Sequence, residues 1–149
     1  MTTQVYDVII IGAGSVGLPT ELFMAQAGLK PLVIDQFASP GQGSNKAAIG
    51  GIRATHSAPS KIRLGLKSLE VFSTWEETYG DDIEWYQGGY SFVAYSEREE
   101  RALKDLLKVQ QAYGLDIRWL DRDDLLEVIP DLQPEHLLGG TYSPGDGSA

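Results

Sequence analysis

The chain has 149 residues, and its 21 aspartates and glutamates against 12 lysines and arginines give a formal net charge of −9. This acidity argues against nucleic acid or an anionic membrane as the main partner, and the absence of cysteine excludes disulfides, thiolate metal sites and a cysteine-linked cofactor within these residues. No apolar run approaches the roughly 18 residues of a membrane span, and the opening residues lack a signal-peptide pattern, so we expect a cytoplasmic protein.

The opening of the chain predicts a strand, a helix and a second strand. Residues 5–11 are almost continuously apolar and β-branched, which predicts a strand that is buried on both faces. A helix is expected from about residue 15 to residue 27, with Gly28 as its C-terminal stop. Residues 32–34 form the second short apolar run, which predicts the second strand of a βαβ unit.

Three glycines in G-x-G-x-x-G spacing join the first strand to the helix, a pattern typical of dinucleotide binding. Gly12 permits the tight turn, Gly14 leaves room for a pyrophosphate beside the backbone, and Gly17 lets the helix lie close to the sheet. The free N–H groups at the start of the helix, near Ser15, would face the phosphates. Asp35 follows the second strand, where a carboxylate can accept hydrogen bonds from ribose hydroxyls and disfavours a 2′-phosphate.

Residues 39–46 form a loop by composition. Within it, Gly43 and Ser44 either offer N–H and hydroxyl donors to the phosphate site or form only a flexible turn. The next stretch has no clear period, and its glycine pair at residues 50–51 would let a flat ring approach the backbone. Arg53 follows that pair, and its guanidinium either grips a carboxylate through two parallel hydrogen bonds or forms a surface salt bridge.

The middle of the chain changes from helical to strand periodicity. Residues 59–79 carry apolar side chains at helical spacing, and Gly80 ends this predicted helix. Residues 83–95 are rich in β-formers around two glycines, which predicts either paired strands or one bent strand. Ser96 then begins another helix, because Glu99 three residues later completes a capping box.

The last third of the chain contains shorter elements. We expect the helix that begins at Ser96 to end at Gly114, and residues 117–120 to form a short strand. Asp121 should cap a short helix that Pro130 terminates. Residues 139–149 predict one short strand and a turn.

The two histidines do not suggest a metal site. His56 and His136 lie far apart in the sequence, with no cysteine or paired acids nearby, so no metal ligand set is expected. We expect His56 to be capped or packed rather than catalytic, and His136 to lie on the surface.

Three stretches of the chain resemble the N-terminal part of the FAD-dependent amino-acid oxidoreductases: the glycine unit with Asp35, residues 41–53, and residues 74–80. Within that family the chain is similar to sarcosine oxidase, to the β subunits of heteromeric sarcosine oxidase and proline dehydrogenase, and to glycine and D-amino-acid oxidases. The resemblance covers essentially the whole chain. The glycine motif is shared with many flavoproteins, whereas the stretch that ends at Arg53 is more particular to this group.

The resemblance implies FAD as the cofactor and places its site in the first part of the chain. Residues 47–53 would pass beside the flavin ring, and Arg53 would help to bind the substrate carboxylate. The residues expected to bind the cofactor are Gly12, Gly14, Ser15, Val16, Gly17, Asp35, Gln36, Gly43 and Ser44.

The implied fold is α/β: a Rossmann-like FAD-binding βαβ unit followed by the start of a mixed α+β substrate domain. We expect residues 1–80 to be the N-terminal part of the FAD-binding domain. Residues 81–149 would be a partial substrate domain that returns toward the FAD domain at its end. Family enzymes continue well beyond this length, so we interpret the chain as an N-terminal fragment or a truncated gene product.

The activity implied by the resemblance is oxidation of the C–N bond of a small amino acid, such as sarcosine, proline, glycine or a D-amino acid, to an imine. The alternative is a non-catalytic dinucleotide-binding module, or a subunit that needs a partner chain or self-associates. A nicotinamide-dependent dehydrogenase is disfavoured by residues 41–53. We expect the 149-residue chain alone to be inactive.

Overall fold

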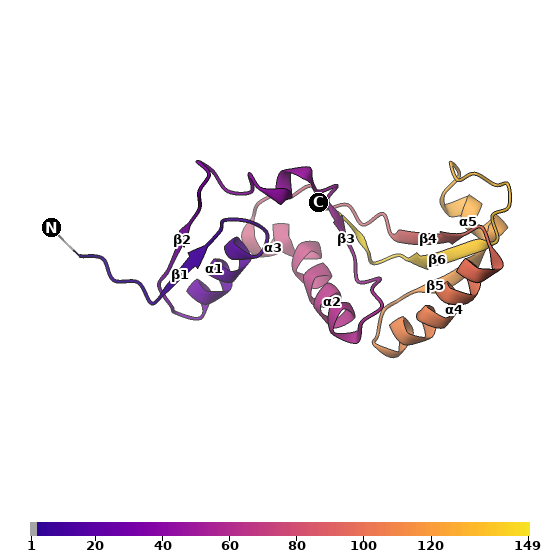
Figure 1. Ribbon diagram of the computed structural model, residues 1–149, viewed down its shortest axis with the longest axis horizontal. Coiled ribbons are helices and arrows are strands. Elements are labelled where there is room, and N and C mark those ends of the chain that lie inside the picture. The colour runs from indigo at the N-terminus through magenta and orange to yellow at the C-terminus, as the bar shows by residue number, and fades with distance from the viewer. Residues whose placement is uncertain (1–2) are drawn as a thin grey trace. The chain divides into compact units, whose positions relative to one another are not determined.

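The computed structural model describes residues 3–149. The chain folds into two compact units, one ending at Ile49 and the other spanning Gly50–Ala149 (Figure 1). The first unit contains β1 (Val8–Ile11), α1 (Gly17–Gln26), β2 (Pro31–Ile34) and the 3₁₀ helix η1 (Ser44–Ala47). The second contains β3 (Gly51–Ile52), α2 (Pro59–Ser73), α3 (Trp75–Tyr79), β4 (Tyr90–Ala94), α4 (Glu97–Ala112), β5 (Arg118–Asp121), α5 (Arg122–Val128), β6 (Gly139–Ser143) and β7 (Gly147–Ser148).

The first unit is the βαβ unit that the glycine spacing predicts. The strands β1 and β2 pair in parallel, with Ile10 opposite Val33, and α1 connects them. The helix ends just before Gly28, whose φ of +84° is the left-handed conformation expected of a helix stop. Pro19 lies in the first turn of α1, where backbone N–H groups have no partner within the helix, so its missing donor costs nothing.

The strand β1 is shorter than the predicted strand over residues 5–11, and only one of its faces is covered. Val8 and Ile10 are half-buried, whereas Ile9 is 60% and Ile11 is 85% exposed. The prediction of a strand buried on both faces is therefore wrong for this unit. The physical reason is that α1 covers one side of the two-stranded sheet, and no other described element of the unit covers the opposite side.

The second unit is built on a three-stranded antiparallel sheet in the order β4-β6-β5. The helix α4 packs on this sheet, and α5 packs beside β5 and β6 (Figure 1). The predicted pair of Ser96 and Glu99 caps α4, with the return bond made one residue before the N-cap. The Ser96 hydroxyl accepts a hydrogen bond from the Glu99 N–H at 3.3 Å, and the Glu99 carboxylate accepts one from the Tyr95 N–H at 2.9 Å. Asp121 caps α5 as expected, by accepting hydrogen bonds from two N–H groups of its first turn.

The helix predicted over residues 59–79 is interrupted at Thr74, which separates α2 from α3. The hydroxyls of Ser73 and Thr74 donate to the carbonyl of Glu70 at 3.2 and 2.8 Å. Such local side-chain bonds compete with the regular helical ladder, which explains a break that apolar spacing alone does not reveal. Gly80 ends α3 in the left-handed conformation, as predicted.

The two short strands β3 and β7 were not predicted. They pair antiparallel, with Gly51 opposite Ser148, so the expectation of a single strand within residues 139–149 is wrong. Tyr86 also bridges to Ser148, while β4 begins only at Tyr90. Residues 83–95 therefore form the bent rather than the paired alternative, with a positive φ of +77° at Gly89 in the bend. Two-residue strands have no periodicity from which to predict them.

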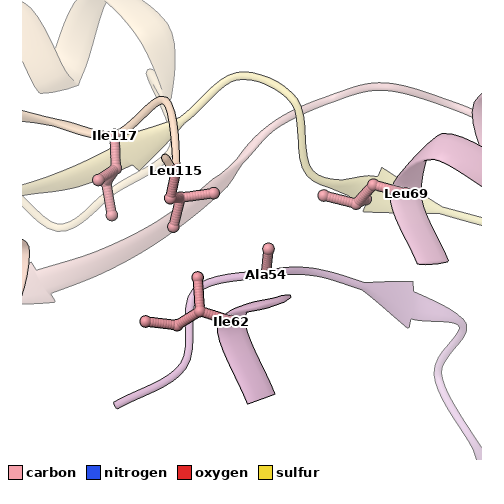
Figure 2. Packing of buried hydrophobic residues seen from close by; sticks show 5 residues of the cluster. All are labelled: Ala54, Ile62, Leu69, Leu115 and Ile117. Atoms are coloured by element: carbon pink, nitrogen blue, oxygen red, sulfur yellow. The ribbon is translucent and has the colours of Figure 1, made fainter. Parts of the chain in front are cut away.

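A cluster of five buried residues joins distant parts of the second unit (Figure 2). Its members come from the segment after β3, from α2, and from the connection between α4 and β5: Ala54, Ile62, Leu69, Leu115 and Ile117. Because α2 packs in this cluster, it belongs to the second compact unit, which begins at Gly50. No helix in the described part of the chain is long and apolar enough to cross a membrane.

Candidate functional site

A cleft of about 870 Å³ lies in the first unit, at the carboxyl ends of β1 and β2. Parallel strands place their carboxyl ends on one edge of a sheet, where open α/β folds bind ligands. The walls come from the glycine turn with the start of α1, the end of β2, and the loop before η1. All nine residues predicted to bind the cofactor line this cleft: Gly12, Gly14, Ser15, Val16, Gly17, Asp35, Gln36, Gly43 and Ser44.

The glycines of the turn have different geometric roles. Gly12 has a φ of +108°, a conformation that other residues rarely adopt. A Cβ atom on Gly17 would lie 1.8 Å from the carbonyl oxygen of Gly12, so only glycine fits at this contact between helix and turn. A Cβ atom on Gly14 would meet only the Asn45 side chain, at 3.2 Å, so its backbone borders open space in the cleft.

The N-terminus of α1 faces this cleft, and its N-cap residue makes no capping hydrogen bond. Val16, at the N-cap position, makes no side-chain cap, and the first turn contains no acidic side chain. The helix therefore presents its positive end to the cleft, which favours an anionic ligand. Together with the space beside Gly14, this arrangement fits the pyrophosphate of a dinucleotide.

Asp35 is held as a carboxylate at the end of β2. Its Oδ2 accepts a hydrogen bond from the Ala13 N–H at 2.6 Å, and its Oδ1 accepts one from the Phe37 N–H at 2.8 Å. These two bonds, the one from Ala13 above all, hold the pKa of Asp35 below its usual value. Each oxygen keeps a further lone pair, so the ionised side chain can still accept hydrogen bonds from ribose hydroxyls.

Asn45 is a cleft residue that the sequence analysis missed. Its side-chain Oδ1 accepts a hydrogen bond from the Ser15 N–H at 3.3 Å, which ties the loop before η1 to the start of α1. Gly41 adds a second link, since its N–H donates to the carbonyl of Ala13 at 2.9 Å. No spacing pattern marks Asn45, although the amide N–H groups of an asparagine in a glycine- and serine-rich loop are donors that suit a phosphate site.

Arg53 belongs to the second unit and does not line this cleft. It follows β3, and α2 supports its backbone closely: a Cβ atom on Gly65 would lie 2.9 Å from the Arg53 carbonyl oxygen. The Nη1 group of Arg53 donates to the backbone carbonyl of Thr55 and, at 3.2 Å, to the Thr55 hydroxyl. The guanidinium therefore has a defined place rather than a free position on the surface.

Asp146 is a buried acid beside Arg53 that the sequence analysis also missed. Its Oδ1 accepts a hydrogen bond from the Ala54 N–H at 2.9 Å, which connects the turn before β7 to the segment that carries Arg53. Burial raises the pKa of the Asp146 carboxyl, while this hydrogen bond and nearby hydroxyls oppose the shift. A lone aspartate in a turn carries no sequence signal of burial.

His56 lies three residues beyond Arg53. Burial, followed by the charge of Arg53, lowers the pKa of its imidazole. The side chain of Gln110 donates to the backbone carbonyl of His56 at 3.2 Å. Among residues 3–149, no group of three or more histidine, aspartate or glutamate side chains is arranged to hold a metal ion.

A family model described as "FAD dependent oxidoreductase" matches residues 7–149. Glycine oxidase of Geobacillus kaustophilus is 29% identical over 97% of this chain and 40% of its own length. The sarcosine oxidase subunit beta of Rhodobacter capsulatus is 23% identical over 85% of this chain and 31% of its own length.

Solved structures match over almost the whole chain. L-proline dehydrogenase from P. horikoshii superimposes with a TM-score of 0.91 at 24% identity, covering 99% of this chain and 39% of that one. Glycine oxidase from Geobacillus kaustophilus superimposes with a TM-score of 0.82 at 27% identity, covering 98% of this chain and 41% of that one. The predicted α/β fold class is confirmed, and the chain spans about 40% of the length of these relatives.

Proposed function

Because this chain belongs to the family of FAD-dependent oxidoreductases, we propose that the full-length gene product oxidises the C–N bond of a small amino acid to an imine. The candidate substrates are sarcosine, proline, glycine and D-amino acids. The names of the relatives support this class, since they include a glycine oxidase and a sarcosine oxidase subunit. The family match confirms FAD as the cofactor and sets aside a nicotinamide-dependent dehydrogenase.

The observation that carries the proposal is the cleft of the first unit. The backbone beside Gly14 and the positive end of α1 would hold the pyrophosphate, and the Asp35 carboxylate would accept hydrogen bonds from the ribose. When bound, FAD supplies the acceptor for the hydride equivalent that leaves the substrate carbon next to nitrogen. The division into an FAD-binding part up to residue 80 and a substrate part beyond it stays a proposal, as does a cytoplasmic location.

On the substrate side, we propose that Arg53 binds the carboxylate of the amino acid. A guanidinium can donate two parallel hydrogen bonds to a carboxylate and supplies the opposite charge. Thr55 holds one end of this guanidinium, so the group is already oriented before a ligand arrives. An oriented carboxylate would in turn fix the position of the reacting carbon.

The test is a visible absorbance spectrum of the purified full-length protein, followed by assays with sarcosine, proline, glycine and D-alanine. Each amino acid is offered with oxygen and, separately, with an artificial dye as the electron acceptor. We expect flavin bands and turnover of at least one amino acid. A protein without flavin bands after incubation with FAD would contradict the proposal.

A second candidate is a subunit that binds the dinucleotide but needs a partner chain for turnover. The similarity to a sarcosine oxidase subunit favours it. Flavin bands without turnover of any amino acid would support this candidate over the first.

A further inference from the structure

The guanidinium of Arg53 lies against two aromatic rings of β4. Its central carbon is 5.3 Å from the centroid of the Tyr90 ring and 5.2 Å from that of the Phe92 ring. These two residues are two positions apart on one strand, so their side chains lie on the same face of the sheet. The rings also pack against each other, with centroids 5.4 Å apart and planes tilted by 45°.

The hydrogen bonds of the Arg53 guanidinium involve only its Nη1 group within residues 3–149. The Nη1 group bonds to Thr55, and within residues 3–149 neither an ion pair nor another hydrogen bond engages the opposite, Nε–Nη2 edge. Arg53 is half-buried, which strengthens the attraction between its charge and the ring faces. The arrangement therefore fixes a guanidinium through two rings and one threonine, and leaves one edge with two parallel donors unengaged.

We propose that Tyr90 and Phe92 are positioning residues that hold the guanidinium of Arg53 ready for the carboxylate of the substrate, an inference that rests on the proposed role of Arg53. An arginine side chain has many rotamers, and ordering it on ligand binding would weaken the affinity. The aromatic faces and Thr55 order it beforehand. The rings act on the substrate only through Arg53, so their loss should weaken carboxylate binding without removing the charge that binds it.

The test measures carboxylate binding directly, with acetate as the probe. The full-length protein is labelled with ¹⁵N-arginine, and the Nε–H resonance of Arg53 is identified by its disappearance in Arg53→Lys. We expect acetate to shift this resonance in the wild type. In Phe92→Leu and Tyr90→Leu the dissociation constant for acetate should rise about three- to tenfold, the range expected for a lost cation–π contact.

Two conservative variants and one distant variant provide the controls. Phe92→Tyr and Tyr90→Phe keep a ring beneath the guanidinium and should bind acetate within twofold of the wild type. Phe72→Leu removes a ring that packs on Trp85 rather than on Arg53, and should also stay within twofold. If the protein is active, Phe92→Leu should raise KM for the amino acid by the same three- to tenfold, with kcat and flavin content within twofold.

The outcomes separate this inference from the proposed function. If Arg53→Lys binds acetate as tightly as the wild type, measured through the remaining arginine resonances, or keeps the wild-type KM for the amino acid, the carboxylate role of Arg53 and the positioning role are both overturned. If Arg53→Lys loses acetate but Phe92→Leu and Tyr90→Leu keep wild-type affinity, only the positioning role is overturned. If acetate affinity changes as expected while no amino acid is oxidised, the positioning role is supported and the proposed activity fails.

Discussion

Gly14 and Gly17 differ in what surrounds them, although both belong to the same motif. A Cβ atom on Gly17 would collide with backbone atoms of Gly12, which cannot move aside without opening the turn. A Cβ atom on Gly14 would meet only the end of a flexible side chain and would then project into the cleft. One position is therefore constrained by packing, and the other by the space that a ligand needs.

This difference predicts two separable defects in the full-length protein. Gly17→Ala should lower the free energy of unfolding by about 1–3 kcal/mol, the usual cost of overpacking. Gly14→Val should leave the fold intact but abolish flavin binding, because its branched side chain fills the pyrophosphate space. Urea denaturation and flavin absorbance measure the two effects. Gly145→Val, at a site with open surroundings, is the control. A flavin-loaded Gly14→Val protein would contradict the assignment of the pyrophosphate site.

Asp35 provides a second prediction at the scale of a residue. Asp35→Ala should weaken FAD binding about tenfold or more, because the ribose hydroxyls lose a charged acceptor. Titration of the apo-protein with FAD measures this. Asp7→Ala is a matched control, because the Asp7 carboxylate also accepts a backbone N–H bond, from Lys30 at 2.8 Å. The two acids differ in position: Asp7 comes before β1, whereas Asp35 comes after β2. Equal FAD affinity in the two variants would move the ribose site away from Asp35.

Among the elements, the pairing of β3 with β7 determines where Arg53 lies. The turn before β7 carries Asp146, whose carboxylate bonds to the Ala54 N–H next to Arg53. A buried acid with a raised pKa binds its proton more tightly in the folded than in the unfolded state. Its contribution to stability is therefore fully present below the ordinary value of 3.8 and is lost as the pH rises through the raised pKa.

Asp146→Asn tests this linkage, because asparagine keeps the oxygen that accepts the Ala54 N–H but cannot ionise. The difference in unfolding free energy between variant and wild type should shift in favour of the variant as the pH rises from below 3.8 toward neutrality. Urea denaturation across that range measures it. Asp116→Asn, an exposed acid of the same unit, is the control. If the difference in unfolding free energy between variant and wild type does not change with pH, Asp146 is not the titrating group.

On the scale of the whole molecule, one face of the β1–β2 sheet is apolar and uncovered within its unit. Ile9 and Ile11 point to this face, and Ile34, which is 45% exposed, pairs directly opposite Ile11. Contiguous apolar surface on a small sheet favours association with other chains.

We therefore expect the 149-residue chain by itself to self-associate, to bind FAD weakly and to lack amino-acid oxidation activity. Ile11→Lys should reduce the self-association, measured by sedimentation velocity over a range of concentrations. Ile49→Lys should not, because Ile49 is 92% exposed outside the sheet. A flavin-loaded monomer with robust turnover would contradict this prediction.

The sequence alone determined the features that a few neighbouring residues specify. The turn at Gly12, the capping box of Ser96 with Glu99, and the Asp121 cap all lie where the spacing predicts them. Each depends on backbone conformation or hydrogen bonds within one or two turns of the chain, so no distant partner is needed. The predicted cofactor residues also gather in one cleft, because a βαβ unit brings the ends of its parallel strands together.

Only the tertiary structure decided the surroundings of Arg53 and the exposure of β1. The bond between Asp146 and Ala54 joins residues 92 positions apart, and the rings of Tyr90 and Phe92 reach Arg53 from another strand. Which face of β1 is buried depends on the elements that pack against it, so an apolar sequence does not predict the buried face. Contacts between distant segments arise from the packing of whole elements, so a local pattern of residues does not predict them.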